Sequence, residues 1–466
     1  MSNNTISFDN ISLNGRDYRF NCGVYSSTFP DQPANYMPIS FGNLNQLTII
    51  DNIFEPFYNG EVILNATGNF IENNPLFNFK FNSNNRNIFA VQLFPTDVEN
   101  GDKSIQELNT LYINGAIDKL SVMAADTSNT QFQSFEVKDV NQILLEEKKV
   151  TNIYEKINTS ITVAENIKQI LTTGISKDIV NGLYNNGTEK ITQDYIFPIY
   201  FNLFDAINFL LPFNLTIEED LTSQLFLKFD YKVQQFKNFT IFNLFTNAEK
   251  AENNLESFLL GDDDGPPLSD NTVGEATAPA SNVVPKDNKL NNLAYNNVDF
   301  SISNEVLLPM MVSNTTDFTN SNLFTYVDLQ TEIENFQKRI VDKLRPLYTN
   351  DVRLNVDLDP SKINRQNYRV MTSPFSNELN VKVAKAQMYN SFVLHNMSMV
   401  FVTNGKPYRE SGKFINIEKS KSSKVLNTPH ESKIFGQWLV TEVRHIITSS
   451  GSYKNIIQCV KPFVNK

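Results

Sequence analysis

The stretch Gln46–Asn69 has the sequence QLTIIDNIFEPFYNGEVILNATGN. It holds two apolar runs, Leu47–Phe54 and Val62–Leu64, which are separated by a turn rich in polar and aromatic residues. Short β-rich runs bracketed by Pro and Asn-Gly are typical of antiparallel strands. Pro56 cannot donate to a sheet ladder, so the chain must leave the sheet there. We expect Asn59-Gly60 to supply the positive φ of the return turn, and the stretch therefore predicts a long, partly buried β-hairpin.

The length and composition of the chain bound its class. A chain of 466 residues should hold several domains, because one core rarely serves more than about 250–300 residues. Hydrophobic residues make up 41%, which is ordinary for a soluble protein. The sequence has no window of about 18 apolar residues and starts without a basic region followed by an apolar one. We therefore expect neither a membrane-spanning segment nor a signal peptide.

Charge and cysteine content exclude further classes. The net charge of −11 and the pI of about 5.0 make the chain a poor general binder of nucleic acid or anionic membrane, since phosphate contacts need clustered Lys and Arg. The two cysteines, Cys22 and Cys459, lie at opposite ends of the chain and form no disulfide framework. This pattern predicts a reducing compartment or a particle that is assembled inside the cell.

The remaining secondary structure is predicted from periodicity. Residues 1–110 have the alternation and Asn/Gly breaks of a compact β-barrel or sandwich. Apolar residues at helical spacing predict helices near 161–171, 201–211, 328–347 and 381–394, the first one ending at Gly174. Strands are expected at 76–81, 88–94, 225–229, 239–244, 397–402 and 413–417, and a final hairpin is expected at 438–447 and 453–460.

Residues 254–296 differ from the rest of the chain. They show almost no periodicity and are rich in Pro, Gly, Ser, Thr and Asp, so we expect a solvated linker or an arm that orders against a neighbouring subunit. The run Asp262–Gly265 lacks the alternating acids, the Gly at the sixth position and the closing Glu of a calcium loop of the EF-hand type. A metal site is not expected there.

The sequence carries no signature of catalysis. Its three histidines, His395, His430 and His445, do not pair at metal-ligand spacing, and neither cysteine has a CxxC partner. Phosphate-binding, nucleophile-elbow and zinc-protease motifs are absent. The abundant carboxylates leave a glycosidase pair open, but no local pattern singles one out. We expect no enzyme, no catalytic, cofactor-binding or metal residues and no cofactor, and a structural role for His445.

Four segments together resemble one known family. The C-terminal sequence Gly436–His445, followed by a return strand from Tyr453 to Lys461, looks like the closing hairpin of baseplate hub proteins from contractile-tailed bacteriophages. The stretch Asn404–Tyr408, with Gly412 and Phe414–Ile417, resembles a segment that this family shares with the hub-like part of type VI secretion spikes. The hairpin Ile49–Val62 is similar to the first barrel of the family, and the segment 193–211 resembles its "Pro, aromatic, helix" segment.

This resemblance implies a mainly β fold with α+β parts. It implies two tail-tube-like β-barrels in one chain plus additional α/β domains, and three chains that form a ring with pseudo-sixfold symmetry. The domains expected from it are a first tube-like barrel at 1–110, an α+β domain at 111–195, a helix and strands of the second barrel or clamp region at 196–253, a polar flexible insertion or arm at 254–296, strands and a helix of the α+β region at 297–380, and C-terminal strands completing the second barrel region at 381–466. The aromatic corner Phe54–Tyr58 is expected near a subunit boundary.

The resemblance also implies partners and a place in the virion. A structural hub of this kind joins a hexameric tail tube protein to a trimeric spike protein, contacts baseplate wedge proteins and lines the channel for tape-measure protein and then DNA, which is bound only in transit during genome ejection. The homotrimer would belong to the tail baseplate of a contractile tail and be assembled in the host bacterial cytoplasm. The acidic chain suits such a channel, since like charge keeps DNA from sticking.

Two alternatives remain at this point. A β-rich virion protein could instead recognise a receptor carbohydrate. A hub could also carry cell-wall hydrolase activity, for which residues 254–296 would be the insertion point, although that stretch is too short and too polar to fold as an enzyme.

Overall fold

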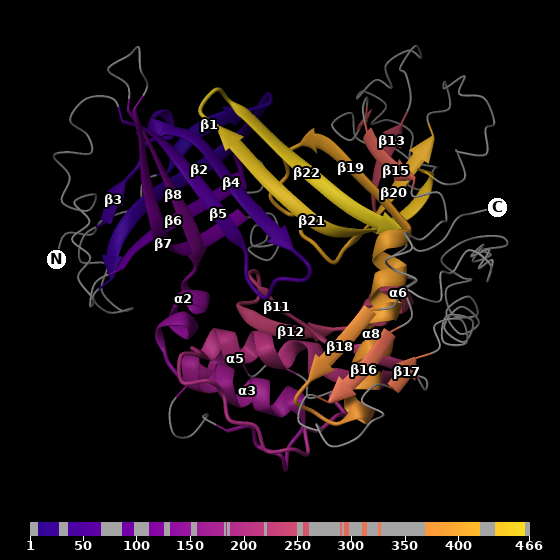
Figure 1. The fold of residues 1–466 in the computed structure, drawn as a ribbon. Coiled ribbons are helices and arrows are strands. Elements are labelled where there is room, and N and C mark those ends of the chain that lie inside the picture. The colour runs from indigo at the N-terminus through magenta and orange to yellow at the C-terminus, as the bar shows by residue number, and fades with distance from the viewer. Residues whose placement is uncertain are drawn as a thin grey trace.

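The hairpin expected at residues 46–69 lies in the middle of one large sheet in the computed structural model (Figure 1). It consists of β4 (Leu44–Asn52) and β5 (Asn59–Ala66), which pair antiparallel and confirm the prediction. The structure describes residues 8–27, 36–66, 86–96, 111–124, 131–150, 156–180, 183, 187–218, 221–248, 255–260, 289–290, 293–297, 310–314, 325–327, 369–419 and 434–461.

The return turn of this hairpin differs from the expectation. Gly60 does not have a positive φ; instead, a Cβ at Gly60 would lie 3.2 Å from the carbonyl oxygen of Thr48 in the paired strand. The expected positive φ was therefore wrong, and the glycine allows two backbones to approach closely. The Asn-Gly turn with both residues at positive φ is the one at Asn14-Gly15, where φ is 51° and 78°.

The large sheet has 15 strands in two halves (Figure 1). The N-terminal half contains β4 and β5 with β1 (Asp9–Leu13), β2 (Arg16–Ser27), β3 (Tyr36–Pro38), β6 (Arg86–Pro95), β7 (Leu111–Ala124) and β8 (Gln131–Asp139). The C-terminal half contains β13 (Glu256–Leu260), β14 (Lys289–Leu290), β15 (Leu293–Asn297), β19 (Met397–Asn404), β20 (Phe414–Lys419), β21 (Gly436–Thr448) and β22 (Ser452–Lys461).

The two halves are joined by direct pairing of β4 with β21. The two strands run antiparallel, with Glu442 opposite Asn52 and Thr448 opposite Gln46. On its outer edge β21 pairs with β22, so the hairpins β4–β5 and β21–β22 stand side by side in one ladder. A register shift between Val440 and Glu442 lets the first part of β21 pair with β20 and the second part with β4.

The strand pairings correct the expectation of two separate barrels. Among the described residues, the ladders follow an open path from β1 to β14 with a branch through β22 and β19, and neither half closes into a barrel. The physical reason is that β4 and β21, which would be edges of two sheets, use their hydrogen-bonding groups on each other. The mainly β character with α+β parts is confirmed.

The boundary expected at residue 110 falls inside the N-terminal half. Strand β7 pairs with β6, and β8 pairs with both β7 and β5, so that residues 111–139 continue the same sheet. The core of this half is built from apolar residues of its own strands, and Ile447 and Tyr453 of the C-terminal hairpin also pack in it. The chain leaves the sheet at Asp139, which caps the next helix.

Below the sheet lies a lobe of helices and short strands, called here the lower lobe (Figure 1). Its elements are α2 (Val140–Glu147), α3 (Val163–Gly174), α4 (Lys177–Val180), α5 (Leu203–Leu210), β9 (Leu215–Glu218), β10 (Leu221–Gln224), β11 (Phe226–Asp230), β12 (Gln235–Phe239), α6 (Ile241–Ala248), β16 (Met310–Asn314), β17 (Thr325–Val327), β18 (Arg369–Ser373) and α8 (Asn377–Asn396). Helix α8 runs directly into β19 of the C-terminal half.

The predicted helices at 161–171, 201–211 and 381–394 correspond to α3, α5 and α8. Thr162 with Glu165, and Asn202 with Asp205, form capping boxes that fix where the first two helices begin. The strand predicted at 239–244 is wrong, because the chain turns from β12 into α6 at Thr240, whose hydroxyl accepts from the Asn243 N–H as an N-cap does.

The polar segment 254–296 also needs correction at its ends. Residues 256–260 form β13, which pairs in parallel with β20, and residues 293–297 form β15, which pairs with β19. Phe258 of β13 is fully buried in the core of the C-terminal half, beside the lone tryptophan, Trp438. The Asp262–Gly265 run, His430, the predicted helix at 328–347 and the predicted strand at 76–81 lie outside the described residues.

The corner of the first hairpin inserts into the lower lobe. Phe57 is buried in that core, with its ring centroid 5.5 Å from that of Phe236. The backbone oxygen of Pro56 accepts from the Phe229 N–H at 2.8 Å, and the Tyr58 N–H donates to the hydroxyl of Tyr231 at 2.8 Å. The corner is thus packed mainly within its own chain.

Both cysteines are buried and free, Cys22 in the N-terminal half and Cys459 in the C-terminal half. Burial raises the pKa of both thiols well above the ordinary value, with a further contribution from Asp9 at Cys22. Across the part of the chain that is described, no helix is both long enough and apolar enough to span a bilayer.

Candidate functional site

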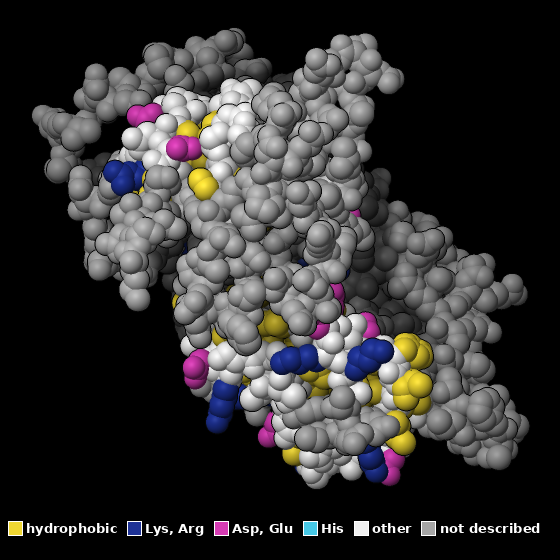
Figure 2. All heavy atoms as spheres, turned by 90° about the vertical axis from the view of Figure 1, so that its left-hand side faces the viewer, with side chains coloured by type: hydrophobic (Ala, Val, Ile, Leu, Met, Phe, Trp, Pro, Cys, Tyr) yellow, Lys and Arg dark blue, Asp and Glu magenta, His cyan; other side chains and the backbone are white. Residues whose placement is uncertain are grey.

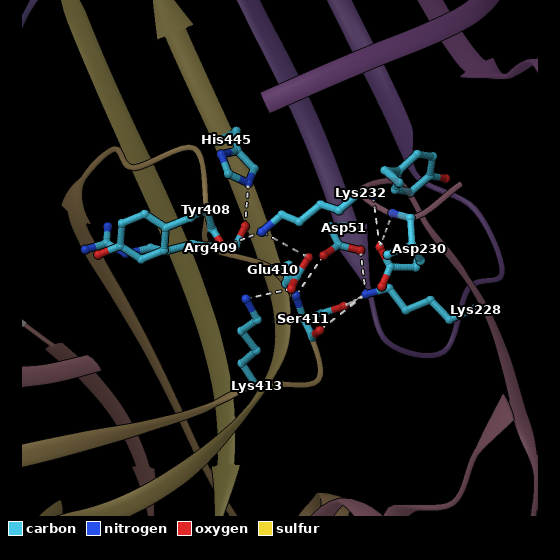
Figure 3. A network of polar contacts seen from close by, with 12 residues as sticks. Asp51, Lys228, Asp230, Lys232, Tyr408, Arg409, Glu410, Ser411, Lys413 and His445 are labelled. Atoms are coloured by element: carbon cyan, nitrogen blue, oxygen red, sulfur yellow. Dashed lines mark hydrogen bonds and ion pairs between the residues drawn. The ribbon is translucent and has the colours of Figure 1, made fainter. Parts of the chain in front are cut away.

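The two halves of the sheet and the lower lobe meet around one cavity of about 900 Å³. Its walls come from β4, from the hairpin of β11 and β12, from the loop Pro407–Lys413 and from β21. Charged side chains from β4, the β11–β12 hairpin and the loop converge there with His445 of β21 (Figure 3). We call Asp51, Lys228, Glu256, Arg409, Ser411 and His445 the junction network.

Asp51 of β4 connects the sheet to the lower lobe. Its carboxylate lies 2.8 Å from the amine of Lys228 on β11 and accepts the backbone N–H of Ser411 at 2.7 Å. The amine of Lys228 also donates to the Ser411 hydroxyl. Burial alone would raise the pKa of the Asp51 carboxyl, but the ion pair with Lys228 and the Ser411 N–H bring it below the ordinary value. The residue is therefore held as a carboxylate inside the junction.

Arg409 and Glu256 form a second, more buried ion pair. The guanidinium donates to both carboxylate oxygens, from Nε at 3.0 Å and from Nη2 at 2.8 Å, which is the bidentate geometry. It also donates to Asn455 Oδ1 at 3.0 Å and lies over the Phe258 ring at 5.2 Å. Although burial raises the pKa of Glu256, the hydrogen bonds and charge of Arg409 lower it to about 2. This pair fixes β13 to the loop before β20.

His445 lies fully buried on β21, facing the same loop. Its Nδ1 is 2.8 Å from the Tyr453 hydroxyl and 3.0 Å from Asn455 Nδ2, and its Nε2 is 3.1 Å from the carbonyl oxygen of Arg409. The neutral ring with its proton on Nε2 satisfies all three contacts, because the carbonyl can only accept and the amide nitrogen can only donate. Burial lowers the pKa of the imidazole to about 4, which keeps this neutral form.

A third group of charges lies at the cavity wall. Glu410 is shared by two lysines, with Lys413 at 2.6 Å and Lys232 at 3.7 Å. The Lys232 amine also donates to the carbonyl oxygen of Tyr408 at 3.4 Å. Burial lowers the pKa of Lys232, and the neighbouring Lys413 acts in the same direction against Glu410. Figure 3 shows both amines turned toward this single carboxylate.

The arrangement favours holding elements together over bond-making chemistry. Each carboxylate of the junction network is neutralised by a cation, and the histidine nitrogens contact a tyrosine, an asparagine and a backbone carbonyl. No group of three or more His, Cys, Asp and Glu side chains that could hold a metal occurs among the described residues. Removing one partner of such a buried pair strongly destabilises a fold, because the other charge is left uncompensated.

The structure gives His445 the structural position expected for it, while the carboxylates and cations around it were not expected. Asp51 interrupts the apolar run Leu47–Phe54, and Glu256 lies two residues before the apolar stretch Phe258–Leu260 in the same strand. A charge inside a buried strand is the sequence signal that could have identified both residues. Lys228 carries the same signal, because it interrupts the apolar run Leu225–Phe229, but Arg409 lies in a polar loop and does not. Each partner lies more than 150 residues away, so the pairing itself has no signal in the sequence.

Comparison with known proteins finds solved structures of similar fold but no related sequence. No protein-family model matches the sequence, and no curated protein matches it either. A tail protein from Neisseria meningitidis MC58 is 7% identical with a TM-score of 0.47, over 95% of this chain and 96% of that one. The 43 kDa tail protein of prophage MuSo2 from Shewanella oneidensis is 10% identical with a TM-score of 0.49, over 95% and 98%.

A chain of the lidded Francisella PdpA–VgrG complex is 10% identical with a TM-score of 0.50, over 98% of this chain and 54% of that one. The chain shares that fold. The resemblance to hub and spike proteins that the sequence predicts is thereby confirmed at the level of the fold.

Proposed function

We propose that this protein is the central hub of a phage tail baseplate and acts as a structural component without catalysis. Three copies form a ring that adapts the hexameric tail tube to the trimeric spike, contacts wedge proteins and lines the channel for tape-measure protein and DNA. The proposed domains follow the expected order along the chain, from 1–110 through 381–466, but residues 111–139 belong with the first domain, because β7 and β8 continue its sheet.

The observation that carries the proposal is the pairing of β4 with β21. It places two antiparallel hairpins side by side within one chain, with the order β5, β4, β21 and β22. A ring of three such chains would present six hairpins, which is the number that a hexameric tube requires. Three chains that contact a sixfold partner on one face and a threefold partner on the other need two copies of the contacting hairpin in each chain.

The junction network supports a mechanical role. It connects β4, β11, β13 and β21 through two mostly buried ion pairs and the hydrogen bond between His445 and the carbonyl oxygen of Arg409. An adaptor transmits load between a tube and a spike, so its sheet and its lower lobe must keep a fixed relation. Ion pairs with defined geometry and full hydrogen bonding provide this kind of positional specificity.

Exposed apolar side chains on the lower lobe suit contacts with other subunits. Ile196, Ile199 and Tyr200 are 62%, 83% and 73% exposed and belong to one short loop. The backbone of that loop is held by hydrogen bonds from Ile157 to Tyr195 and from Phe201 to Pro198. Figure 2 shows hydrophobic side chains gathered on the surface of the lower lobe. Clusters of this kind mark protein contact sites more often than isolated exposed residues do.

The proposal is tested by native mass measurement of the purified protein and by electron imaging of tail particles. We expect a species of three times the chain mass and three copies on the tail axis between tube and spike. A stable monomer that binds glycan and is absent from the tail axis would overturn the hub and favour receptor recognition. Release of peptidoglycan fragments that a single carboxylate substitution abolishes would overturn the non-catalytic part.

A further inference from the structure

The cavity at the junction has the opposite charge balance to the chain. Its lining includes five cationic side chains and three carboxylates, namely Lys228, Lys232, Lys237, Arg409 and Lys413 against Asp51, Asp230 and Glu410. Arg409 is neutralised by Glu256, which lies outside the lining, so with His445 neutral a local excess of one positive charge remains in a chain whose net charge is −11. The excess is concentrated in a concave, partly buried place.

Two of these lysines have carboxylates of their own. Lys228 pairs with Asp51 at 2.8 Å, and Lys237 pairs with Asp230. Lys232 and Lys413 share Glu410, so one negative charge serves two amines. The side chain of Lys232 is 17% exposed, and its distance of 3.7 Å from Glu410 is too long for a good hydrogen bond. Its other contact is the uncharged carbonyl oxygen of Tyr408 at 3.4 Å, so this largely buried amine is only weakly paired with an anion and favours a further one beside it.

Apolar and aromatic groups line the rest of the cavity. Tyr231 and Phe239 contribute partly exposed aromatic rings. Ile49 of β4 and the turn residues Ile53 and Tyr58 also border the cavity, but their side chains are only 3%, 0% and 3% exposed. The rings of Tyr58 and Tyr231 are 4.3 Å apart and anchored by the Tyr58 N–H to Tyr231 hydroxyl bond, so this wall is preformed. A volume of about 900 Å³ lies within the usual range for small-molecule sites, which combine an apolar lining with a few polar groups.

We propose that this cavity binds a small organic anion, whose phosphate or carboxylate group lies between Lys232 and Lys413 and whose apolar body packs against the rings of Tyr231 and Phe239. The binding is non-covalent. It is independent of the assembly proposed above, since every residue involved belongs to one chain.

The test measures binding of two probes to the full chain by isothermal titration calorimetry. Phenyl phosphate and benzoate each combine the same aromatic ring with one of the two anionic groups, while inorganic phosphate and benzyl alcohol each lack one part. We expect at least one of the aromatic anions to bind more tightly than both partial probes, and more weakly as salt increases. The better of the two identifies the anionic group.

Single substitutions of charged residues test whether Lys232 and Lys413 bind the anion. We expect Lys232→Gln and Lys413→Gln each to weaken binding roughly tenfold, the effect of losing one charge-assisted hydrogen bond. Glu410→Gln should tighten binding, because it releases both amines from their shared carboxylate. Lys156→Gln removes a lysine whose side chain is 55% exposed and paired with Asp194 at the surface, and should change nothing. The Lys413 side chain is 52% exposed, so its variant tests the site without disturbing the core.

Three outcomes would overturn the inference. One is that neither aromatic anion binds the wild-type chain more tightly than the partial probes do. Another is binding of equal strength in the wild type, Lys232→Gln and Lys413→Gln. The last is weaker binding in Glu410→Gln, which would mean that the carboxylate contacts the ligand directly and that the ligand is not held as an anion.

Discussion

The carboxylate of Asp51 lies 2.8 Å from the amine of Lys228, and this contact joins the central sheet to the lower lobe across 177 positions of sequence. Asp51 stands on β4 opposite Val443 of β21, at the seam between the two halves. One ion pair therefore lies where three parts of the molecule meet. Its integrity should decide whether these parts unfold together.

We expect Asp51→Asn to lower the free energy of unfolding by about 2–3 kcal/mol, because Lys228 is left half-buried without its carboxylate. Adding Lys228→Met should restore most of that loss, since an apolar pair avoids the desolvation of two charges. Chemical denaturation followed by circular dichroism measures both changes. The matched control is Asp194→Asn, which breaks the exposed pair with Lys156 and should cost under about 0.5 kcal/mol. Equal losses at the two sites would contradict the role given to Asp51.

His445 should make the fold sensitive to mild acid. Its pKa is about 4 in the folded chain against 6.5 for an ordinary imidazole, so its contribution is complete above pH 6.5 and is lost progressively as the pH falls toward 4. The loss should reach about 2–3 kcal/mol, and His445→Gln should flatten this part of the profile. Urea midpoints from Trp438 fluorescence between pH 7 and 4.5 measure it. An unchanged slope in the variant would show that other groups cause the dependence.

Asp139 should give the stability of the fold a pH dependence of the opposite sign. It caps α2 by accepting the Asn141 N–H at 2.7 Å, and burial raises its pKa from 3.8 to about 7 despite that bond. Its contribution is complete below pH 3.8 and is lost as the pH rises through 7. Asparagine caps as well as aspartate and carries no charge, so Asp139→Asn should stabilise the fold by about 1–3 kcal/mol at pH 8 and much less at pH 5. Because both residues titrate in one range, the His445 profile is best measured in this background.

The corner of the first hairpin gives a test of packing. Phe57→Ala should cost about 3–5 kcal/mol, because it opens a cavity among Phe204, Phe229 and Phe236 of the lower lobe. Phe54→Ala, three residues away, should cost under about 1.5 kcal/mol, since that ring is 37% exposed and meets Phe226 at its edge. Thermal unfolding of the two variants side by side compares them. A larger loss at Phe54 would mean that the corner is placed differently.

Local patterns in the sequence predicted the elements well where burial is periodic. The hairpin 46–69, helices α3, α5 and α8 and the hairpin β21–β22 follow from apolar spacing, and the resemblance assigned both hairpins to one family. The strand expected at 239–244 failed because alternating Phe, Ile and Leu suit a strand and an amphipathic helix equally, and Thr240 decided between them as an N-cap. Strand β13 was not predicted, because composition assigned it to the polar segment 254–296, at whose start it lies.

The pairing that joins the two halves of the sheet could not be predicted from the sequence, because it depends on which edge strands form hydrogen bonds with each other. Nothing in the sequence of β4 shows that its free edge meets β21, and two closed barrels satisfy the same alternation. The junction network was missed for a related reason. Asp51 with Lys228, and Glu256 with Arg409, become neighbours only after the sheet is assembled.

The burial of Cys22 and Cys459 has a practical consequence. Thiol reagents react with exposed thiolates, and both native sulfurs are hidden in strands and held protonated by their surroundings. A cysteine introduced at an exposed position, such as Ile199 on the lower lobe, would thus carry a maleimide dye without replacement of the native residues. Energy transfer between dyes on neighbouring copies could then report subunit spacing in solution.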